Sequence, residues 1–210
     1  MERSIKFWNK RSKIYDISVY EKYKTVYDET ASPARKYLKP GDHALDFACG
    51  SGSLTLDLAG SVQHILAIDT SDMMIELANK KAKDQHIENV EFRNTGIFDP
   101  ALEPGSFDVV MAFNIFQFIR DENTVLERIS ALLNDNGIFI QATDCHSEYR
   151  SVLVLIMKIL SRLKFLPYVR SWTIKGLENS LINNNFEVLE KKLLYEMPVN
   201  YFIAAKKQCQ

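Results

Sequence analysis

The sequence predicts an α/β fold with a doubly wound, seven-stranded, mostly parallel sheet between two layers of helices. Two observations lead to this three-layer α/β/α prediction. Short apolar runs typical of strands alternate with stretches whose apolar residues recur at helical spacing. Only residues 196–200 separate the last two strand-like runs, too few for a helical crossover, so these runs should form a C-terminal antiparallel hairpin. At 210 residues the chain has the length of one such domain, and we expect a single domain over residues 1–210.

Each strand is predicted from an apolar run bounded by turn-forming or charged residues. The predicted strands cover residues 43–48, 64–69, 90–93, 107–113, 137–143, 186–194 and 201–206. Helices are predicted between the earlier strands from apolar residues three or four apart, namely Leu54 and Leu58, then Met74, Leu77 and Ala78, then Val125, Ile129 and Leu132. This alternation implies right-handed crossovers, which place a ligand at the carboxyl ends of the strands.

Polar residues set the expected ends of these helices. Ser71 or Asp72 should cap the second helix, and Asp121 and Glu122 should begin the third, where their charge suits a helix N-terminus. The Asn-Asp-Asn-Gly run at residues 134–137 should end the third helix and turn the chain before the fifth strand.

Composition argues against several classes of function. A formal net charge of −1 leaves no excess of basic residues to neutralise a phosphate backbone, so no nucleic-acid partner is expected. Cys49, Cys145 and Cys209 are too scattered for a disulfide framework or a metal site, and we interpret them as thiols in a reducing compartment. The N-terminus lacks the apolar core of a secretory signal, which favours a cytoplasmic protein. The apolar run 152–160 is too short and too charged to span a bilayer.

The turn after the first strand has the composition of a ligand-binding loop. Gly50 and Gly52 lack a Cβ, which lets the backbone turn sharply and approach a ligand, although a Gly-x-Gly pair also occurs in ordinary strand-to-helix turns. Asp69 ends the second strand about 20 residues later, where a carboxylate can accept both ribose hydroxyls or can cap the next helix. The two features together favour a nucleotide-like ligand.

At these residues the chain resembles the class I S-adenosylmethionine-dependent methyltransferases, and among them the small-molecule, type 11-like group. Residues 45–52, Leu-Asp-Phe-Ala-Cys-Gly-Ser-Gly, resemble the first motif of the family, and residues 68–74 resemble its acidic loop. Residues 106–110, 132–140 and the closing hairpin resemble its later strands, so the resemblance covers nearly the whole chain. It implies a Rossmann-like fold, S-adenosylmethionine as cofactor with S-adenosylhomocysteine as product, and a small-molecule methyl acceptor.

The resemblance also assigns roles to individual residues. Asp46 would anchor the methionine ammonium, residues 48–52 would wrap the methionine portion, and Asp69 would hold the ribose. Thr70 and Met74 would flank the adenine, with residues 96–98 along its other edge and the Asn114 backbone near the methionine. Tyr15 belongs to a helical cover segment over residues 1–40 and would approach the cofactor. The full predicted set is Tyr15, Asp46, Ala48, Cys49, Gly50, Ser51, Gly52, Asp69, Thr70, Met74, Gly96, Ile97, Phe98 and Asn114.

Two residues depart from the pattern of the family. Ala48 stands where Gly is usual, and we expect it to fit the turn with a negative φ. Gly96 stands where an Asp often binds the adenine amino group, a loss that would weaken adenine binding by about 1–3 kcal/mol. A backbone contact or Asp99 would be the substitute.

Methyl transfer requires a general base only when the acceptor must lose a proton. His146 follows the fifth strand with Asp144 and is the candidate base because its pKa range suits that role, the alternative being a solvated loop histidine. Asn114 and Gln117 are placed to orient an acceptor, and the segment lacks the Asn-Pro-Pro-aromatic signature of nucleobase methylation. No acidic cluster for a hard cation is evident, so we predict no metal.

Residues 147–175 interrupt the alternation and are predicted to form a helical insertion that caps the domain. Its segment 149–168 is apolar with interspersed Lys and Arg, which suits an apolar acceptor, peripheral membrane contact through residues 152–168, or simple packing on the domain. The leading hypothesis is therefore methyl transfer to a small, apolar molecule. The alternatives are a protein or RNA methyltransferase and a catalytically inactive S-adenosylmethionine-binding regulator. A nicotinamide-dependent oxidoreductase is disfavoured because Thr55 breaks the Gly-x-Gly-x-x-Gly spacing.

Overall fold

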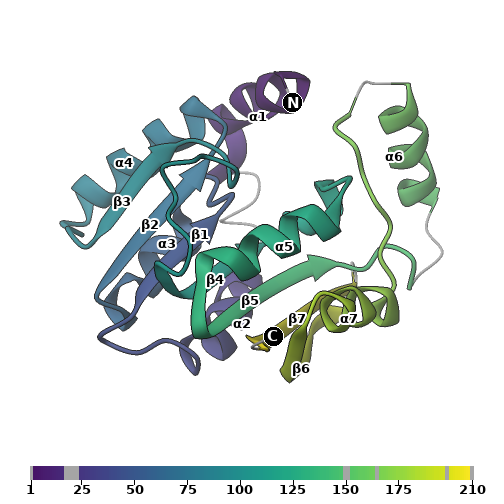
Figure 1. Ribbon diagram of the computed structural model, residues 1–210. Helices are drawn as coiled ribbons and strands as arrows, with labels where there is room; N and C mark the ends of the chain where they lie inside the picture. The colour runs from purple at the N-terminus through teal and green to yellow at the C-terminus, as the bar shows by residue number, and fades with distance from the viewer. Residues whose placement is uncertain (1, 17–23, 149–151, 164–165, 197–198, 209–210) are drawn as a thin grey trace.

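Figure 1 shows a computed structural model of the chain, which describes residues 2–16, 24–148, 152–163, 166–196 and 199–208. Seven strands form one sheet in the order β3-β2-β1-β4-β5-β7-β6. All neighbours from β3 to β5 are parallel, whereas β7 runs antiparallel to both β5 and β6. The predicted fold class, including the C-terminal hairpin, is confirmed; residues 197 and 198 of that hairpin lie outside the described residues.

Most strands match their predicted positions within two residues. They are β1 (His43–Phe47), β2 (His64–Asp69), β3 (Val90–Asn94), β4 (Phe107–Phe113), β5 (Leu133–Asp144), β6 (Phe186–Glu196) and β7 (Val199–Lys207). The helices are α1 (Glu2–Tyr15), α2 (Lys24–Arg35), α3 (Ser53–Leu58), α4 (Asp72–Asp84), α5 (Glu122–Leu132), α6 (Val152–Arg162) and α7 (Ile174–Asn183), with short 3-10 turns η2 (Ala59–Ser61) and η3 (Phe116–Phe118).

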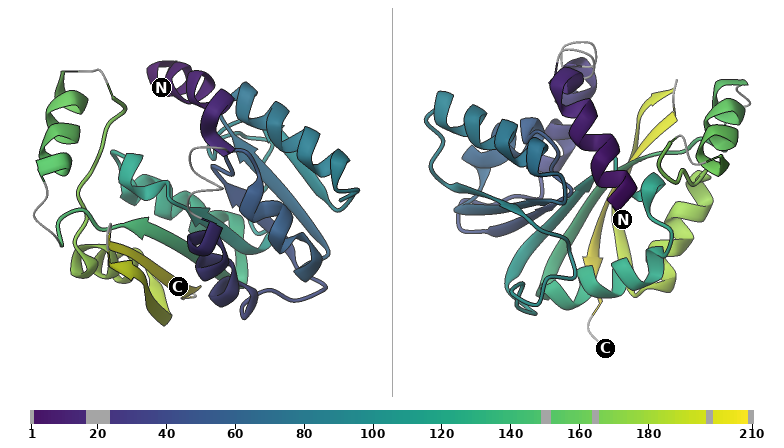
Figure 2. Two further views of the ribbon diagram at one scale, coloured as in Figure 1. Left: turned by 180° about the vertical axis from the view of Figure 1, so that it is seen from behind. Right: turned by 90° about the horizontal axis from the view of Figure 1, so that it is seen from above.

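Helices cover both faces of the sheet (Figure 2), and each face has its own apolar cluster. Successive residues of one strand point to opposite clusters: Val110 packs with α5 and α7, whereas Val109 and Met111 pack with α2 and α3. Burial on both faces explains why the inner strands are continuous apolar runs rather than alternating ones.

Two predicted caps are confirmed and one predicted boundary is wrong. The Ser71 hydroxyl accepts from the Met74 N–H at 3.2 Å, and the Asp121 carboxylate accepts from the Thr124 N–H at 3.2 Å. The 134–137 run does not precede β5 but lies inside it, because Leu133 already pairs with Phe107 and the register then shifts so that Ile138 pairs with Val109. The Asn134 side chain donates to Asp108 at 2.6 Å, which holds this irregularity against β4.

The insertion forms α6, which projects from the sheet on the side away from α4 (Figures 1 and 2). The helix is shorter than the predicted apolar segment, and residues 149–151 and 164–165 lie outside the described residues. Ile156, Ile159 and Leu163 are 46%, 48% and 61% exposed, so this side of the segment presents apolar surface to solvent. No helix within the described ranges has the length and apolar character needed to cross a membrane.

Candidate active site

A cavity of about 320 Å³ lies at the carboxyl ends of β1, β2 and β4. This is the edge at which parallel α/β sheets bind ligands, beside the point where the strand order reverses from β1 to β4. α1 and α2 supply further wall residues, and the loop after β3 completes the wall.

Thirteen of the fourteen predicted cofactor-binding residues line this one cavity, and Gly52 is the exception. They reach it from α1, the β1–α3 loop, the end of β2, the start of α4, the loop after β3 and the end of β4. Their individual roles stay predictions. The candidate base His146 and the candidate orienting residue Gln117 are 7% and 3% exposed, and neither lines the cavity.

The β1–α3 loop turns through three left-handed residues, Ala48, Gly50 and Gly52, with φ of 62°, 56° and 74°. The negative φ expected for Ala48 is wrong. The loop must reverse directly after β1 while the Cys49 N–H donates to the Ile68 carbonyl at 3.0 Å, and this turn forces Ala48 into a region that disfavours a Cβ.

The surroundings of Gly50 and Gly52 differ in whether they leave space for a Cβ atom. A Cβ on Gly50 would meet no atom within 4 Å. A Cβ on Gly52 would lie 2.8 Å from the Phe92 ring and 2.9 Å from the Ala78 Cβ. Gly52 therefore allows the loop to pack against β3 and α4, which explains why it does not line the cavity.

Asp46 is a buried acid in the cavity wall, only 2% exposed. Its Oδ2 accepts from the Thr55 hydroxyl at 2.5 Å. Burial raises the pKa of Asp46 to about 7, opposed by the Thr55 hydrogen bond and reinforced by the nearby Asp69 charge. A carboxylate this poorly compensated favours a cationic ligand.

Asp69 is fixed at the end of β2 by backbone donors. The Gly50 N–H donates to Oδ2 at 3.0 Å and the Ser71 N–H donates to Oδ1 at 2.8 Å. Burial raises the pKa of Asp69, while these hydrogen bonds oppose the rise. Each oxygen keeps further acceptor capacity, so the carboxylate is oriented for a pair of hydroxyl donors.

The opposite wall comprises Thr70, Met74 and the loop after β3. A Cβ on Gly96 would contact only the Thr70 Cγ2, at 3.6 Å, so the wall has space for a side chain there. Asp99, the suggested substitute acceptor, does not line the cavity. Its carboxylate instead accepts from the Thr95 hydroxyl at 2.6 Å and the Ala101 N–H at 2.8 Å, which holds its own loop.

Part of the aromatic wall was not predicted from the sequence. Ser4 and Trp8 lie on the same face of α1 as the predicted Tyr15 and line the cavity with it, together with Tyr27 and Phe118. The Trp8 ring packs edge-on against Phe118, with ring centroids 5.5 Å apart, and so joins α1 to η3. Helical spacing of Ser4, Trp8 and Tyr15 was the available signal. Burial raises the pKa values of Tyr15 and Tyr27, so both remain protonated hydroxyls.

Asn114 ends β4 with φ 55° and is held by residues that lie outside the cavity wall. Its Oδ1 accepts from Asn200 Nδ2 at 2.8 Å, and its carbonyl accepts from Gln117 Nε2 at 2.8 Å. Asn200 also donates to Asp144 at 2.7 Å. Burial raises the pKa of Asp144, while the Asn200 bond and the His146 charge lower it. The predicted Asp144–His146 pair thus belongs to a buried network behind the wall.

The remaining sequence expectations concern thiols and metals. Cys49 and Cys145 are free thiols, and burial raises both pKa values; Cys209 lies outside the described residues. In the ranges that the structure describes, no three His, Cys, Asp or Glu side chains gather as a metal site would require.

The profile of the methyltransferase domain family matches residues 38–191. Because this is most of the chain, the chain belongs to the methyltransferase domain family, and the resemblance predicted from the sequence is confirmed.

Individual relatives agree with this assignment. The chain is 25% identical over 184 residues to the ubiquinone biosynthesis O-methyltransferase of Bradyrhizobium diazoefficiens, covering 79% of this chain and 71% of that protein. It is 35% identical over 96 residues to the demethylmenaquinone methyltransferase of Lactococcus lactis, covering 44% of this chain but only 38% of the relative. The geranyl diphosphate C-methyltransferase of Streptomyces coelicolor, solved with Mg²⁺, geranyl diphosphate and S-adenosyl-L-homocysteine, has the same fold, with a TM-score of 0.69, 14% identity and coverage of 84% and 78% of the two chains.

Proposed function

We propose that this chain transfers a methyl group from S-adenosylmethionine to a small, apolar acceptor. The observation that carries the proposal is the pair of carboxylates at adjacent strand ends in one cavity, the buried Asp46 and the partly buried Asp69. S-adenosylmethionine carries an ammonium, a sulfonium and a carboxylate, so its net charge is positive, and it also offers two neighbouring ribose hydroxyls as donors. Asp46 would hold the ammonium, and Asp69 would accept from the two ribose hydroxyls.

The cofactor, once bound, supplies an activated methyl group, so the chain mainly has to bind, orient and exclude water. Residues 48–51 would wrap the methionine portion, and Met74 with the loop 96–98 would enclose the adenine. Space beside Gly96 supports an adenine edge that meets backbone groups rather than a carboxylate. Trp8, Tyr15 and Phe118 would shield the reacting end from water.

An apolar acceptor is supported by this aromatic wall. Trp8, Tyr27, Phe113, Ile115 and Phe118 offer rings and an aliphatic side chain but few polar groups to orient a hydrophilic substrate. The names of the relatives point the same way for part of the acceptor, since demethylmenaquinone is a quinone and geranyl diphosphate joins an apolar geranyl chain to a charged diphosphate.

We further propose that methyl transfer proceeds without a side chain of this protein as general base. Within the described residues, the cavity wall contains no imidazole or amine, and its tyrosines have raised pKa values. An arylamine, which is neutral near pH 7, can attack through its nitrogen lone pair without a protein base. A phenol or hydroquinone has to lose its proton, in this case to solvent. His146 keeps the role of a base only as a prediction, and its burial behind the wall gives it no support.

The cover and the cap are also proposals. Residues 1–40 would close one side of the cavity, and residues 147–175 would act as an apolar cap that touches a membrane surface and receives an apolar acceptor. The exposed Ile156, Ile159 and Leu163 support this contact. Replacing all three by Ser should reduce sedimentation with phosphatidylglycerol vesicles, whereas Ile182→Ser, equally exposed on α7, should not.

Methyl transfer itself is testable with S-adenosylmethionine labelled in its methyl group. Incubation with a panel of hydroquinones, catechols, isoprenoid phenols and arylamines should move label into at least one acceptor, and Asp46→Asn should abolish the transfer. Tight binding of the cofactor without transfer to any acceptor would instead favour the catalytically inactive regulator.

A further inference from the structure

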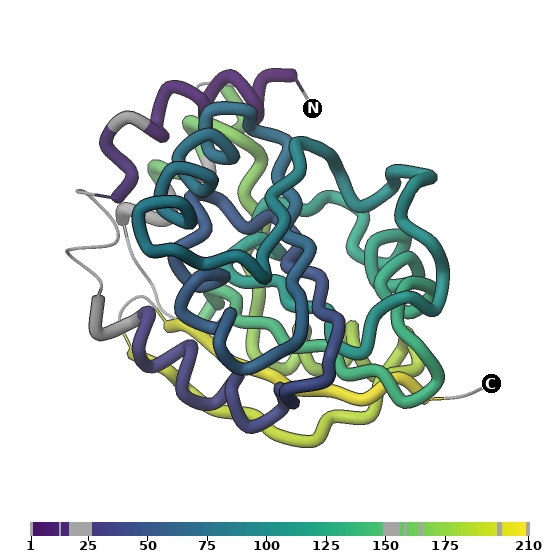
Figure 3. Tube along the Cα trace, turned by 90° about the vertical axis from the view of Figure 1, so that its left-hand side faces the viewer, coloured from purple at the N-terminus to yellow at the C-terminus, as the bar shows by residue number. Residues whose placement is uncertain are grey.

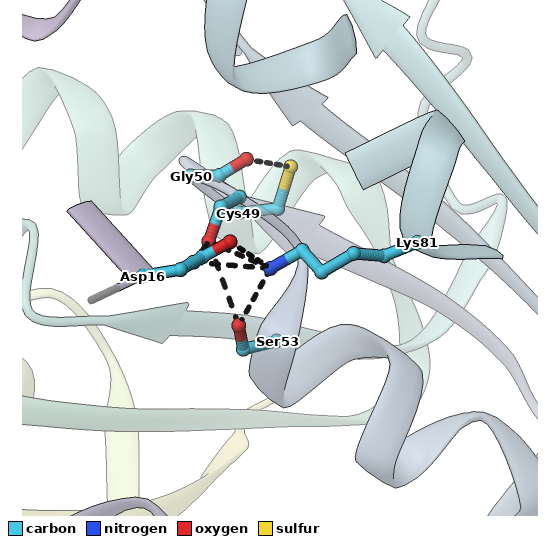
Figure 4. Close-up of polar contacts among 6 residues, drawn as sticks. Asp16, Cys49, Gly50, Ser53 and Lys81 are labelled. Carbon is cyan, nitrogen blue, oxygen red and sulfur yellow. Dashed lines mark hydrogen bonds and ion pairs between the residues drawn. The ribbon is translucent and has the colours of Figure 1, made fainter. Parts of the chain in front are cut away.

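A polar cluster joins the end of α1 to the β1–α3 loop and to α4 (Figure 4). Lys81 Nζ lies 3.0 Å from Asp16 Oδ2 and donates to Ser51 Oγ at 3.0 Å and to Ser53 Oγ at 2.8 Å. The Ser51 hydroxyl donates in turn to Asp16 Oδ1 at 2.6 Å. Three side chains, Asp16 at the end of α1, Ser51 just before α3 and Ser53 at its start, thus converge on the Lys81 ammonium.

The cluster stands behind the cavity wall. Ser51 and Ser53 line the cavity, whereas Asp16 and Lys81 do not. The side chains of Lys81 and Asp16 are 22% and 32% exposed, so their ion pair is shielded from water more than an ordinary surface pair. Burial lowers the pKa of Lys81, while the hydrogen bond and charge of Asp16 raise it. The ammonium therefore depends on Asp16 for compensation.

A second contact fixes α1 to the other end of α4. Asn9 Oδ1 accepts from the Ser71 hydroxyl at 2.5 Å, and Asn9 Nδ2 donates to Asp72 at 2.6 Å. Asn9 and Asp16 are about two helical turns apart, so they share one face of α1. Figures 1 and 3 show α1 lying beside α4 accordingly. Trp8 and Tyr15 directly precede these anchors and line the cavity, so the same helix holds α4 with one face and covers the cavity with another.

We propose that the Asp16–Lys81 pair is a latch that holds α1 over the cofactor cavity and sets how fast cofactor enters and leaves. The inference rests on the proposed function, since it assumes that the cavity takes the cofactor. In this proposal the pair is closed in both the free and the cofactor-bound protein, so its opening precedes both binding and release. Breaking it raises the association and dissociation rates together and leaves the dissociation constant nearly unchanged. A residue that merely shaped Ser51 for cofactor contact would raise the dissociation constant instead.

The test is stopped-flow binding of S-adenosylhomocysteine to the full chain, followed by tryptophan fluorescence, because Trp8 lines the cavity. Asp16→Asn and Lys81→Met should each raise both rate constants about three- to tenfold, the range for a partly shielded ion pair. The reversed pair, Asp16→Lys with Lys81→Glu, should restore rates close to wild type. Arg35→Met is the matched control: it breaks the 2.7 Å Arg35–Asp57 pair between α2 and α3 and should leave the rates unchanged.

Rates within twofold of wild type in both single variants would overturn the latch, as would a raised dissociation constant with an unchanged association rate. Hydrogen exchange of the α1 amides in the ligand-free protein provides a readout that needs no cofactor. Faster exchange over residues 2–16 in both single variants would support the latch. If S-adenosylhomocysteine did not bind the wild-type protein, that failure would reject the proposed function but not the latch. Unchanged exchange would reject the latch.

Discussion

Ala48 holds a left-handed conformation, φ 62°, at a position where a Cβ is unfavourable. Ala48→Gly should therefore raise the free energy of unfolding by up to about 1 kcal/mol, after allowing for the greater chain entropy of glycine in the unfolded state. Gly52→Ala should do the opposite, because its Cβ would lie 2.8 Å from Phe92. Urea denaturation of both variants checks this, and a less stable Ala48→Gly protein would contradict the loop conformation.

Asp46 makes cofactor affinity depend on pH. Its pKa is raised to about 7 by burial, and the ammonium group of the ligand binds its ionised form, so protonation of Asp46 competes with binding. The dissociation constant of S-adenosylhomocysteine should be flat above pH 8 and rise as pH falls below 7, approaching tenfold per pH unit. Asp69, with its pKa also raised, contributes with the same sign. Calorimetry from pH 5.5 to 8.5 should show a smaller dependence for Asp46→Asn; an identical pH dependence would contradict the role of Asp46.

Gly96 leaves a gap in the adenine wall that a side chain can fill. Since its Cβ would contact only Thr70 at 3.6 Å and its φ is not positive, Gly96→Asp should fold normally. A charge-assisted hydrogen bond to the adenine amino group should then tighten S-adenosylhomocysteine binding about tenfold. Unchanged or weaker binding by the folded variant, measured by calorimetry, would place the adenine elsewhere.

At the scale of the elements, β7 holds the ends of β4 and β5 together through one side chain. Asn200 donates to both Asn114 and Asp144, and it is 1% exposed. Asn200→Ala would remove hydrogen bonds to the partly buried Asn114 amide and Asp144 carboxylate, so the free energy of unfolding should fall by about 1–3 kcal/mol for the two bonds together. Urea denaturation measures the loss. Asn184→Ala, which removes an exposed hydrogen bond at the end of α7, is the control. An equal loss of unfolding free energy in the two variants would contradict the stabilising role of Asn200.

The strands were predictable because residues buried on both faces are apolar without interruption. The start of β5 could not be predicted, because the residues of Asn134–Gly137 favour a turn locally. Only the pairing with β4 keeps them within the strand. Asn200 was missed for a related reason: its contact with Asn114 depends on the register of β7 against β5, which no local pattern encodes.

At the scale of the whole molecule, the sheet order brings residues distant in sequence to one cavity. Motif positions on the loops after β1, β2, β3 and β4 were predictable because parallel strands share one carboxyl edge. Helical spacing places Trp8 on the face of α1 that carries Tyr15, but Tyr27 and Phe118 could not be predicted, because the placement of α1 and α2 depends on tertiary contacts such as Asp16–Lys81 and Trp8–Phe118. The burial of His146 could not be predicted either, because the segment after β5 is held by long-range contacts, such as the hydrogen bond from the Cys145 N–H to the Val199 carbonyl, that no local pattern encodes.

The central claim is that this cavity binds S-adenosylmethionine through the carboxylate of Asp69. Calorimetric titration of wild type, Asp69→Ala and the surface control Asp57→Ala tests it most directly, with NADH as the competing ligand class. The account predicts saturable binding of S-adenosylmethionine to wild type and Asp57→Ala, at least tenfold weaker binding to Asp69→Ala, and no binding of NADH. Equal affinity in wild type and Asp69→Ala, or absence of binding to folded wild-type protein, would contradict it.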